Sequence, residues 1–467
     1  MAGIAFRLQK LLKGESYSDL VRAYLYSAVI ASGPFLVVIL TLGALHFVLS
    51  DDMNNEDSAL FRGLIVYAYA FSMIGVAPFL YVITRYLADR YYLKEAEFFT
   101  PTFLTALEVI FLVQGIAGGA YLWFLPILTA VKIAVFVLYL LFSGIWIAMI
   151  FLSAARDYLW IVGAFAVGGV ASVGIAFGLG QYAGLIGHMT GFTAGQALCF
   201  FLLTLRIFNE FGYTRAHDYG LFLYFKKHPA LVVIGIFYYL GIWIDKALFW
   251  FSEQGHTIVK GLQLSPIYDT PLFLAYLTVV PSMAFFLAQM ETSFVKYYNA
   301  YYKAVRERAP LNVIRRRCQA MSDDVTRQFL RFVVLQGAIS GFIILFLYQI
   351  ADTFHLNPAE MGVFRIALLG AFLQMGFLMV VNLLFYFDLQ RDLAKLCILF
   401  FVTNTVFTAF SLSWGSASYG FGFASATFVS FFAAFLTLDK RLDELDYLTF
   451  MKQPIFIPKF KLEAESK

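Results

Sequence analysis

Among the ionisable residues in long apolar stretches of the sequence, five are candidates for a functional role: Glu108, Lys132, Asp245, Lys246 and Arg365. A charged side chain costs about 2.5–3.5 kcal/mol at the centre of a membrane-spanning helix, so such residues tend to face water or a partner. We therefore predict that these five line a central aqueous pathway. In the alternative interpretation, Asp245 and Lys246 neutralise other groups, and Lys132 and Arg365 anchor helix ends at the membrane surface.

Adjacent positions on a helix point about 100° apart, so we do not expect Asp245 and Lys246 to pair directly with each other. The apolar stretches also carry uncharged polar groups, and the chain has 28 tyrosines. Hydroxyl hydrogen bonds and stacking on aromatic rings are how sugars bind, so a glycan suits such a pathway better than an inorganic ion. Aromatic belts at the membrane surface use the same residues and are the alternative explanation.

Pro34, Pro78 and Pro281 lie in the middle of apolar stretches. Each leaves a backbone carbonyl without its helical partner and permits bending. Bending suits a transporter that opens alternately to the two sides of a membrane, although proline is common in membrane helices generally.

Motifs for enzymatic chemistry are missing. The sequence has no Walker A, GxSxG or HExxH motif, and Cys199, Cys318 and Cys397 show no metal-ligand spacing. We therefore predict no catalytic residue, no metal and no cofactor. One enzymatic alternative stays open: Asp51-Asp52 could serve a polyprenyl-dependent membrane glycosyltransferase.

Composition identifies the class of protein. Of 467 residues, 61% are hydrophobic and only 14% are charged, against about 25% charged in a soluble domain. A helix needs about 20 mostly apolar residues to cross a membrane. We predict an all-α polytopic protein with twelve transmembrane helices near residues 24–49, 61–84, 101–124, 127–152, 159–180, 184–207, 229–252, 268–291, 327–351, 359–386, 393–413 and 417–437.

The basic residues indicate the orientation of these helices. With both termini in the cytoplasm, 28 of the 34 Lys and Arg fall on the inner side, as the positive-inside rule requires. The net charge of +4 therefore reflects topology and not nucleic-acid binding. The predicted parts are an amphipathic N-terminus 1–23, a six-helix bundle 24–207, a linker 208–228, a second bundle 229–437 with a basic loop 292–327, and a tail 438–467.

An internal repeat of six plus six helices is indicated by Arg156-Asp157 and Arg391-Asp392, which stand at corresponding places in the two parts. Such halves typically surround a central cavity. Small residues four positions apart are also frequent in one region, at Gly174/Gly178, Gly187/Gly191 and Gly191/Gly195. They predict close packing of the fifth and sixth helices.

The N-terminal sequence resembles the PelG family of inner-membrane transporters, in the stretch Met1–Leu12, in Arg22-Ala23-Tyr24 and in Ser32-Gly33-Pro34. The resemblance implies the MOP flippase superfamily and a bacterial inner membrane, where the protein would export a hexosamine-rich exopolysaccharide for biofilm matrix. It also implies three partners: a PelF-like cytosolic UDP-sugar glycosyltransferase, a PelD-like cyclic-di-GMP receptor and a PelE-like membrane protein.

The basic loop 292–327 contains Arg315, Arg316 and Arg317. These could dock an acidic surface of the cytosolic glycosyltransferase, or instead contact lipid headgroups. A MATE-like drug or cation antiporter, with Glu108 or Asp245 as its cation-linked acid, is the rival transport function. A non-transporting scaffold for the synthase is a third alternative.

Overall fold

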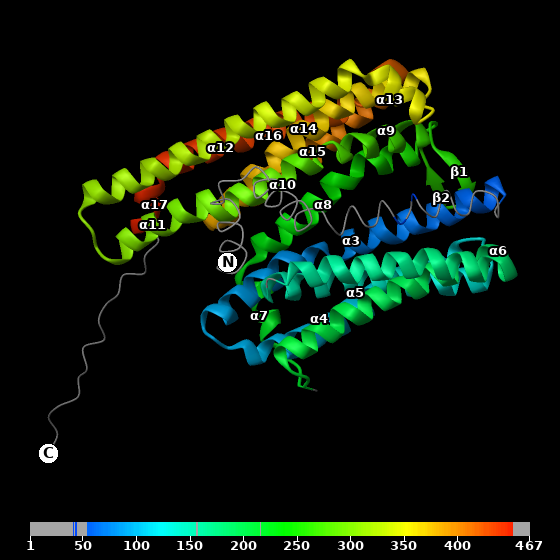
Figure 1. The fold of residues 1–467 in the computed structure, drawn as a ribbon, viewed down its shortest axis with the longest axis horizontal. Helices are drawn as coiled ribbons and strands as arrows, with labels where there is room; N and C mark the ends of the chain where they lie inside the picture. The colour runs from blue at the N-terminus through cyan, green and yellow to red at the C-terminus, as the bar shows by residue number, and fades with distance from the viewer. Residues whose placement is uncertain (1–40, 42, 44–53, 156, 215, 452–467) are drawn as a thin grey trace, which may run out of the picture.

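The computed structural model describes residues 41, 43, 54–155, 157–214 and 216–451, and these form long helices (Figure 1). The N-terminal group and the linker helix comprise α3 (Asn55–Tyr92), the 3₁₀ turn η1 (Ala96–Phe98), α4 (Phe99–Phe124), α5 (Thr129–Ala155), α6 (Tyr158–Phe211) and α7 (Gly220–Lys227). The C-terminal group comprises α8 (Pro229–Trp250), β1 (His256–Val259), β2 (Leu262–Leu264), α9 (Pro266–Leu277), α10 (Val280–Gln289), the π-helical turn η2 (Met290–Phe294), α11 (Val295–Arg306), α12 (Leu311–Leu345), α13 (Leu347–Thr353), α14 (Pro358–Tyr386), α15 (Gln390–Ser413), η3 (Ser416–Ser418), α16 (Phe421–Asp443) and α17 (Leu445–Met451).

α6 is a hairpin of two antiparallel helices. At Gly184 the backbone has φ 56° and ψ −135°, a conformation that favours glycine. On either side of this turn the arms nearly touch: a Cβ added at Gly191 would lie 2.4 Å from Ala176 Cα, and one at Gly195 would lie 2.3 Å from Ser172 N. The predicted close packing of the fifth and sixth helices is thus confirmed at Gly187, Gly191 and Gly195. For Gly174 and Gly178 it was wrong, because both glycines face open space.

Ten segments in the described part of the chain are long and apolar enough to cross a membrane. With the two arms of α6 counted separately, they correspond to the second to twelfth predicted spans. Apart from residues 41 and 43, the first predicted span 24–49, with Pro34, lies outside the described residues. So do the N-terminus 1–23, Asp51-Asp52 and the tail beyond residue 451.

The eighth predicted span is interrupted twice. α9 ends at Leu277 and α10 starts at Val280, with Pro281 in its first turn, so the helix is broken just before Pro281. The π-helical turn η2 then interrupts the regular hydrogen bonding again. Pro78, by contrast, lies inside α3, which continues to Tyr92.

Residues 292–327 were expected to form a loop, but they are mostly helical. α11 and α12 extend as a hairpin with a short turn between Arg306 and Leu311. The reason is visible in α12, where Ile314, Cys318 and Met321 are buried at helical spacing. Charge made the segment too polar to be read as a membrane span, although its helical period continues.

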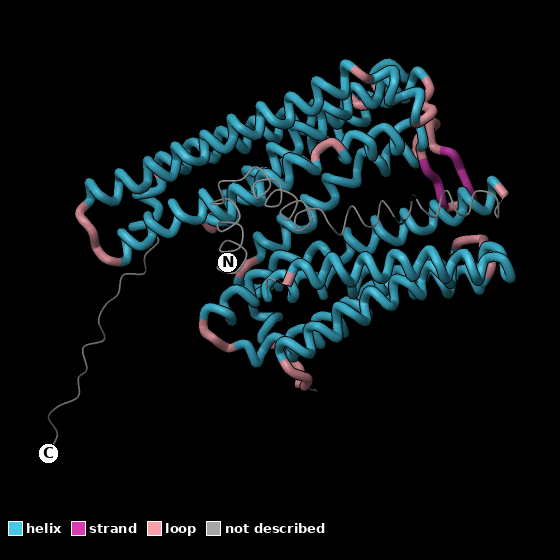
Figure 2. The backbone as a smooth tube through the Cα atoms, viewed as in Figure 1, coloured by secondary structure: helices cyan, strands magenta, loops and turns pink. Residues whose placement is uncertain are grey.

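The two groups lie side by side as elongated layers (Figures 1 and 2). Within the N-terminal group α5 packs against α3, α4 and α6, and within the C-terminal group α15 packs against α8 and α16. The groups meet where α3 packs on α8. The approach is close, because a Cβ at Gly235 of α8 would lie 2.1 Å from the Ala77 carbonyl oxygen of α3. We call this contact the seam.

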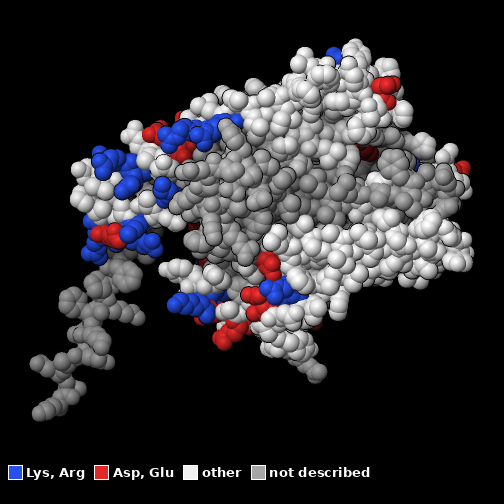
Figure 3. Space-filling view, in the orientation of Figure 1, with Lys and Arg blue, Asp and Glu red and all other residues white. Residues whose placement is uncertain are grey.

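The two ends of the molecule differ in charge. Lys and Arg gather at the end that carries the α11–α12 turn, the α3–α4 turn and α7 (Figure 3). The opposite end carries the β1–β2 hairpin and α13, and it shows few basic residues in this view. We call these the basic end and the hairpin end.

The predicted repeat has a counterpart in paired contacts near the basic end. Asp157 accepts from Arg206 Nε at 2.5 Å, and Asp392 accepts from Arg441 Nε at 2.9 Å. In each case the partners are 49 residues apart. Each arginine also binds a glutamate about one turn further on, Glu210 and Glu444, at 3.0 and 2.8 Å respectively. In each group, therefore, an arginine–aspartate pair at the equivalent position holds two neighbouring helices together.

Candidate functional site

A cavity of about 580 Å³ lies along α3 and α5, in the parts of these helices nearer the basic end. The α3 positions that line it share one face of the helix. The second helix of the seam, α8, contributes Tyr239. The lining residues are Met73, Leu80, Thr84, Leu87, Ala88, Tyr91, Trp146, Met149, Ile150, Ser153, Ala154, Tyr158 and Tyr239.

None of the described residues that line this cavity is charged. Its polar groups are hydroxyls, as on Thr84, Ser153 and Tyr239, and the indole of Trp146; the rest is apolar or aromatic. Such a lining offers ring faces and single hydrogen bonds, but no countercharge for a cation. It therefore suits a neutral ligand that has both hydroxyl groups and apolar faces.

The wall of the cavity is braced by buried polar contacts between α3, α4 and α5. Trp146 Nε1 donates to Ser72 Oγ at 3.1 Å, and Gln114 Nε2 donates to the Ser72 carbonyl at 3.3 Å. Tyr139 OH donates to Gln114 Oε1. Gly75 leaves the space that the Gln114 amide occupies. These bonds fix the indole of Trp146 at the cavity edge.

At the basic end, contacts between the two groups close the seam. Arg85 of α3 lies 3.2 Å from Asp388, which follows α14, and it also lies 3.3 Å from Asp89. One turn earlier, Tyr81 stacks on Phe385 with ring centroids 4.9 Å apart. The ion pair is partly exposed, so its attraction is weakened by water.

At the hairpin end, β1 and β2 lie over the N-terminal group. Tyr67 OH donates to the Gln263 carbonyl at 2.8 Å, and Tyr121 OH donates to the Gly261 carbonyl at 2.8 Å. A Cβ at Gly63 would lie only 3.0 Å from the Ile258 side chain. The hairpin therefore covers the parts of α3 and α4 that lie at the hairpin end.

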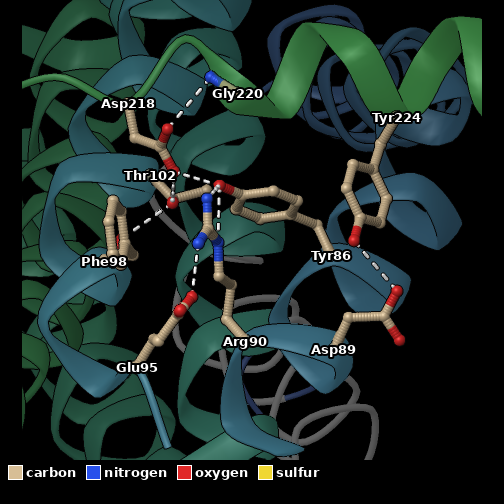
Figure 4. Close-up of polar contacts among 9 residues, drawn as sticks. All are labelled: Tyr86, Asp89, Arg90, Glu95, Phe98, Thr102, Asp218, Gly220 and Tyr224. Atoms are coloured by element: carbon tan, nitrogen blue, oxygen red, sulfur yellow. Dashed lines mark hydrogen bonds and ion pairs between the residues drawn. The ribbon is translucent and has the colours of Figure 1, made fainter. Parts of the chain in front are cut away.

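The linker between the groups is anchored at the basic end through Asp218 (Figure 4). This buried carboxylate accepts hydrogen bonds from Tyr86 OH, from Thr102 Oγ1 at 3.0 Å and from Gly220 N at 2.9 Å. α3, α4 and the start of α7 are thereby tied to one side chain.

Arg90 lies on the other side of Tyr86 (Figure 4). It donates to Tyr86 OH from Nε and Nη2 at 2.9 and 2.7 Å, pairs with Glu95 and covers the ring of Phe98 at 4.0 Å. This arrangement holds the turn between α3 and α4 and positions α7, whose N-terminal residue is Gly220.

On α7 itself, Tyr224 OH donates to Asp89 Oδ2 at 3.0 Å. Burial, followed by this hydrogen bond, raises the pKa of Tyr224, so the hydroxyl stays protonated and able to donate. The bond fastens α7 to α3.

Asp245 and Lys246 lie in α8, and Asp245 is fully buried. It accepts from Tyr268 OH at 2.8 Å, and Lys246 Nζ lies 3.3 Å from its Oδ1. The expectation that these neighbours would not pair was wrong, because the flexible lysine stem folds back to reach both Asp245 and the Ile242 carbonyl at 2.8 Å. The Lys246 ammonium also lies 5.5 Å from the Trp243 ring.

The other three predicted pathway residues lie elsewhere, and none of the five lines the cavity. Glu108 is 64% exposed and 3.4 Å from His217. Lys132 donates to the Trp123 carbonyl at 3.3 Å near the α4–α5 turn, and Arg365 is exposed on α14. The structure brings Asp245 and Lys246 together but none of the remaining three with them.

Arg315, Arg316 and Arg317 are exposed near the start of α12, at the projecting basic end. Arg315 Nε lies 3.9 Å from Asp446 of α17. Among the residues that the structure describes, no group of three or more His, Cys, Asp or Glu side chains could hold a metal ion.

Sequence reasoning missed the cavity residues Trp146 and Tyr239, because it searched for charge. A signal was present: on the stretch that forms α3, Leu80, Thr84, Leu87 and Tyr91 recur at helical spacing and alternate apolar with hydroxyl groups.

Several solved structures share this fold. An outward-facing multidrug-resistance MATE transporter of the MOP superfamily aligns with a TM-score of 0.63 and 12% identity, over 96% of this chain and 99% of that chain. A MOP superfamily transporter from Pyrococcus furiosus gives 0.59 and 12%, and MATE in complex with MaD5 gives 0.61 and 14%, each with the same coverage. No curated protein sequence gives a significant match.

The sequence also matches one family model over residues 1–450, described as "PelG: Putative exopolysaccharide Exporter (EPS-E)". The match spans both helix groups and the linker, and it agrees with the fold shared with the MOP superfamily transporters. The chain is a multi-pass membrane protein that belongs to the PelG family of exopolysaccharide exporters.

Proposed function

We propose that this protein moves a nascent, neutral, hexosamine-rich polysaccharide of the Pel type across the bacterial inner membrane to the periplasm. The observation that carries the proposal is that the described lining residues of the cavity carry ring faces and hydroxyl groups but no charge. N-acetylated hexosamines are uncharged and present both hydroxyls and an apolar ring face. Family membership supplies the export of an exopolysaccharide.

The proposed topology has twelve spans in two six-helix bundles, with the basic end and both termini in the cytoplasm. It is supported by the concentration of Lys and Arg at one end and by the repeated ion pairs of Asp157 and Asp392. The cavity then lies in the cytoplasmic half of the membrane, where a polymer made in the cytosol would enter. Elongation by the synthase, or an ion gradient, would drive the movement.

The α11–α12 hairpin is the proposed docking element for a PelF-like glycosyltransferase. α12 has 35 residues and is therefore about 52 Å long, which exceeds a hydrocarbon core of about 30 Å. Its first turns, with Arg315, Arg316 and Arg317, extend beyond the membrane and can meet an acidic protein surface. PelD-like and PelE-like membrane proteins complete the proposed assembly, with lipids around the spans.

A MATE-like cation antiporter is the second candidate, and buried Asp245 is the observation that favours it. Against it, Asp245 is already paired with Lys246 and no described residue of the cavity lining is acidic. Dye efflux from vesicles that depends on a proton or sodium gradient would support this candidate, and gradient-independent behaviour would exclude it.

Cells that lack the gene and express variants test the export function. Ala88 lines the cavity and is exposed, so Ala88→Trp fills space without disturbing the core. We expect it to reduce secreted polymer at unchanged protein level, whereas Ala130→Trp, on an exposed position of α5, should secrete normally. Normal secretion by the gene deletion itself would refute the export function.

Docking is tested by co-purification with the glycosyltransferase. Replacing Arg315, Arg316 and Arg317 by Glu should weaken it, while replacing the exposed Lys226 and Lys227 of α7 by Glu should not. Equal co-purification of both variants would reject the docking role of α12.

A further inference from the structure

Six aromatic side chains form an unbroken series of ring contacts along the seam, from the cavity to the hairpin end. We call this series the aromatic track. In order it consists of Trp146, Tyr69, Trp243, Trp250, Tyr67 and Tyr121, and successive ring centroids are 5.2, 6.4, 6.2, 4.9 and 6.3 Å apart. Every step is in or near the range of direct ring–ring contact.

The track runs from the cavity towards the hairpin end. Trp146 lines the cavity, and Tyr121 is 38% exposed beneath the β1–β2 hairpin. Between them, Tyr67 and Tyr69 come from α3, while Trp243 and Trp250 come from α8. The track therefore crosses the contact between the two helix groups twice, from Tyr69 to Trp243 and from Trp250 back to Tyr67.

Trp243, in the middle of the track, carries an unused hydrogen-bond donor. Its Nε1 is buried and has no partner among the described residues, whereas Trp146 Nε1 donates to Ser72 and Trp250 Nε1 donates to Asp269 at 2.8 Å. An unpaired buried donor is costly. A ligand oxygen next to the ring would satisfy it.

The distribution of tryptophan sharpens this observation. The chain has six tryptophans. Three are in the track, and the other three, Trp123, Trp160 and Trp414, are 81%, 41% and 79% exposed on other surfaces. The track is thus a separate feature from the aromatic residues that face the surroundings of the protein.

We infer that the aromatic track is the path of the polysaccharide between the cavity and the hairpin end. Sugar rings would stack on each aromatic face in turn as the groups part, and an acetamido or hydroxyl oxygen would accept from Trp243 Nε1. Lys246, with its ammonium 5.5 Å from the Trp243 ring, lies beside the same step. The inference rests on the proposed export function and adds its binding residues.

Binding of a tetramer of N-acetylglucosamine to the purified full-length protein in lipid nanodiscs tests the track, with tryptophan fluorescence as the readout. We expect a saturable change in the unsubstituted protein and in Trp414→Leu, which removes an exposed indole outside the track. Trp243→Leu should weaken binding about tenfold. Trp243→Phe keeps a ring and breaks no hydrogen bond of the structure, so it should weaken binding less.

A second variant, Tyr121→Leu, keeps the test valid if Trp243→Leu misfolds, because Tyr121 lies at the exposed end of the track. It too should weaken binding and reduce secretion. Binding and secretion like the unsubstituted protein in both Trp243→Leu and Tyr121→Leu would overturn the track. If the gene deletion still abolishes secretion, that result removes only the track, whereas normal secretion by the deletion removes the export function itself.

Discussion

A methyl group added to α6 should destabilise the protein where the two arms of the hairpin touch and stabilise it where the helix faces open space. Gly191 and Gly174 lie in the two arms of the same hairpin. A Cβ at Gly191 would lie 2.4 Å from both Cα and N of Ala176, while one at Gly174 would meet nothing within 4 Å. The two Gly→Ala changes are therefore chemically identical and differ only in their surroundings.

The magnitudes follow from these distances. Carbon atoms in contact prefer about 3.5–4.0 Å, so Gly191→Ala must push the arms apart by about 1 Å. Backbone atoms of Ala176 cannot rotate away, and overpacking of this kind costs about 1–3 kcal/mol. At Gly174 the methyl group meets no atom and alanine is the better helix former, so Gly174→Ala should gain about 0.5–1 kcal/mol.

Chemical denaturation in detergent micelles, followed by far-ultraviolet circular dichroism, measures both changes. The expected result is a lower midpoint for Gly191→Ala and an equal or higher midpoint for Gly174→Ala. If both variants shift in the same direction by similar amounts, the arms do not pack through Gly191 and the hairpin geometry of α6 is refuted.

Three further predictions address the charged contacts. Lys246→Met should lower the free energy of unfolding by about 3–5 kcal/mol, because it leaves Asp245 buried without its partner. The double variant with Asp245→Asn should recover most of this loss in the same denaturation assay, and no recovery would show that the two residues act separately. Asp157→Asn and Asp392→Asn should each lower the free energy of unfolding by about 1–3 kcal/mol, because each loses its hydrogen bond to an arginine. Double-mutant cycles with Arg206 and Arg441 should give similar coupling energies at the two sites, and coupling at only one of them would argue that the two helix pairs are not held together in the same way. Arg85→Asp should repel Asp388 and so increase the rate at which a reagent added at the basic end labels a cysteine placed at Ala88. Adding Asp388→Arg should restore the original labelling rate. An unchanged rate in Arg85→Asp would show that this pair does not close the seam.

Most membrane spans could be predicted because lipid imposes a minimum length of apolar sequence. That criterion found α3, α4, α5 and both arms of α6 within a few residues at most ends. It failed where helices leave the membrane: α12 begins at Leu311, well before the predicted start at residue 327. Charged residues end a hydropathy peak, but buried positions such as Ile314 and Cys318 continue the helix.

The cavity could not be predicted from charge. Reasoning from buried ionisable groups selected Asp245 and Lys246, which satisfy each other, and Glu108, which lies on an exposed surface. The cavity is instead defined by which helices pack together, since Trp146 and Tyr239 come from α5 and α8. Sequence spacing can assign a residue to a helix face, but it does not identify the neighbouring helix.

The two ends of the seam are closed by contacts of different strength, and this difference bears on the direction in which a substrate would pass. At the basic end the Arg85–Asp388 pair is 36% and 51% exposed, and such a pair contributes about 0–1 kcal/mol. At the hairpin end, Tyr67 and Tyr121 each bind a hairpin carbonyl, and Leu262 is fully buried against Gly63. The Arg85–Asp388 ion pair at the basic end therefore contributes less to closure than the buried hairpin contacts at the other end. Under the proposed export function, the protein would admit a polysaccharide from the basic end, and release at the other end would require the β1–β2 hairpin to move away from Tyr67 and Tyr121.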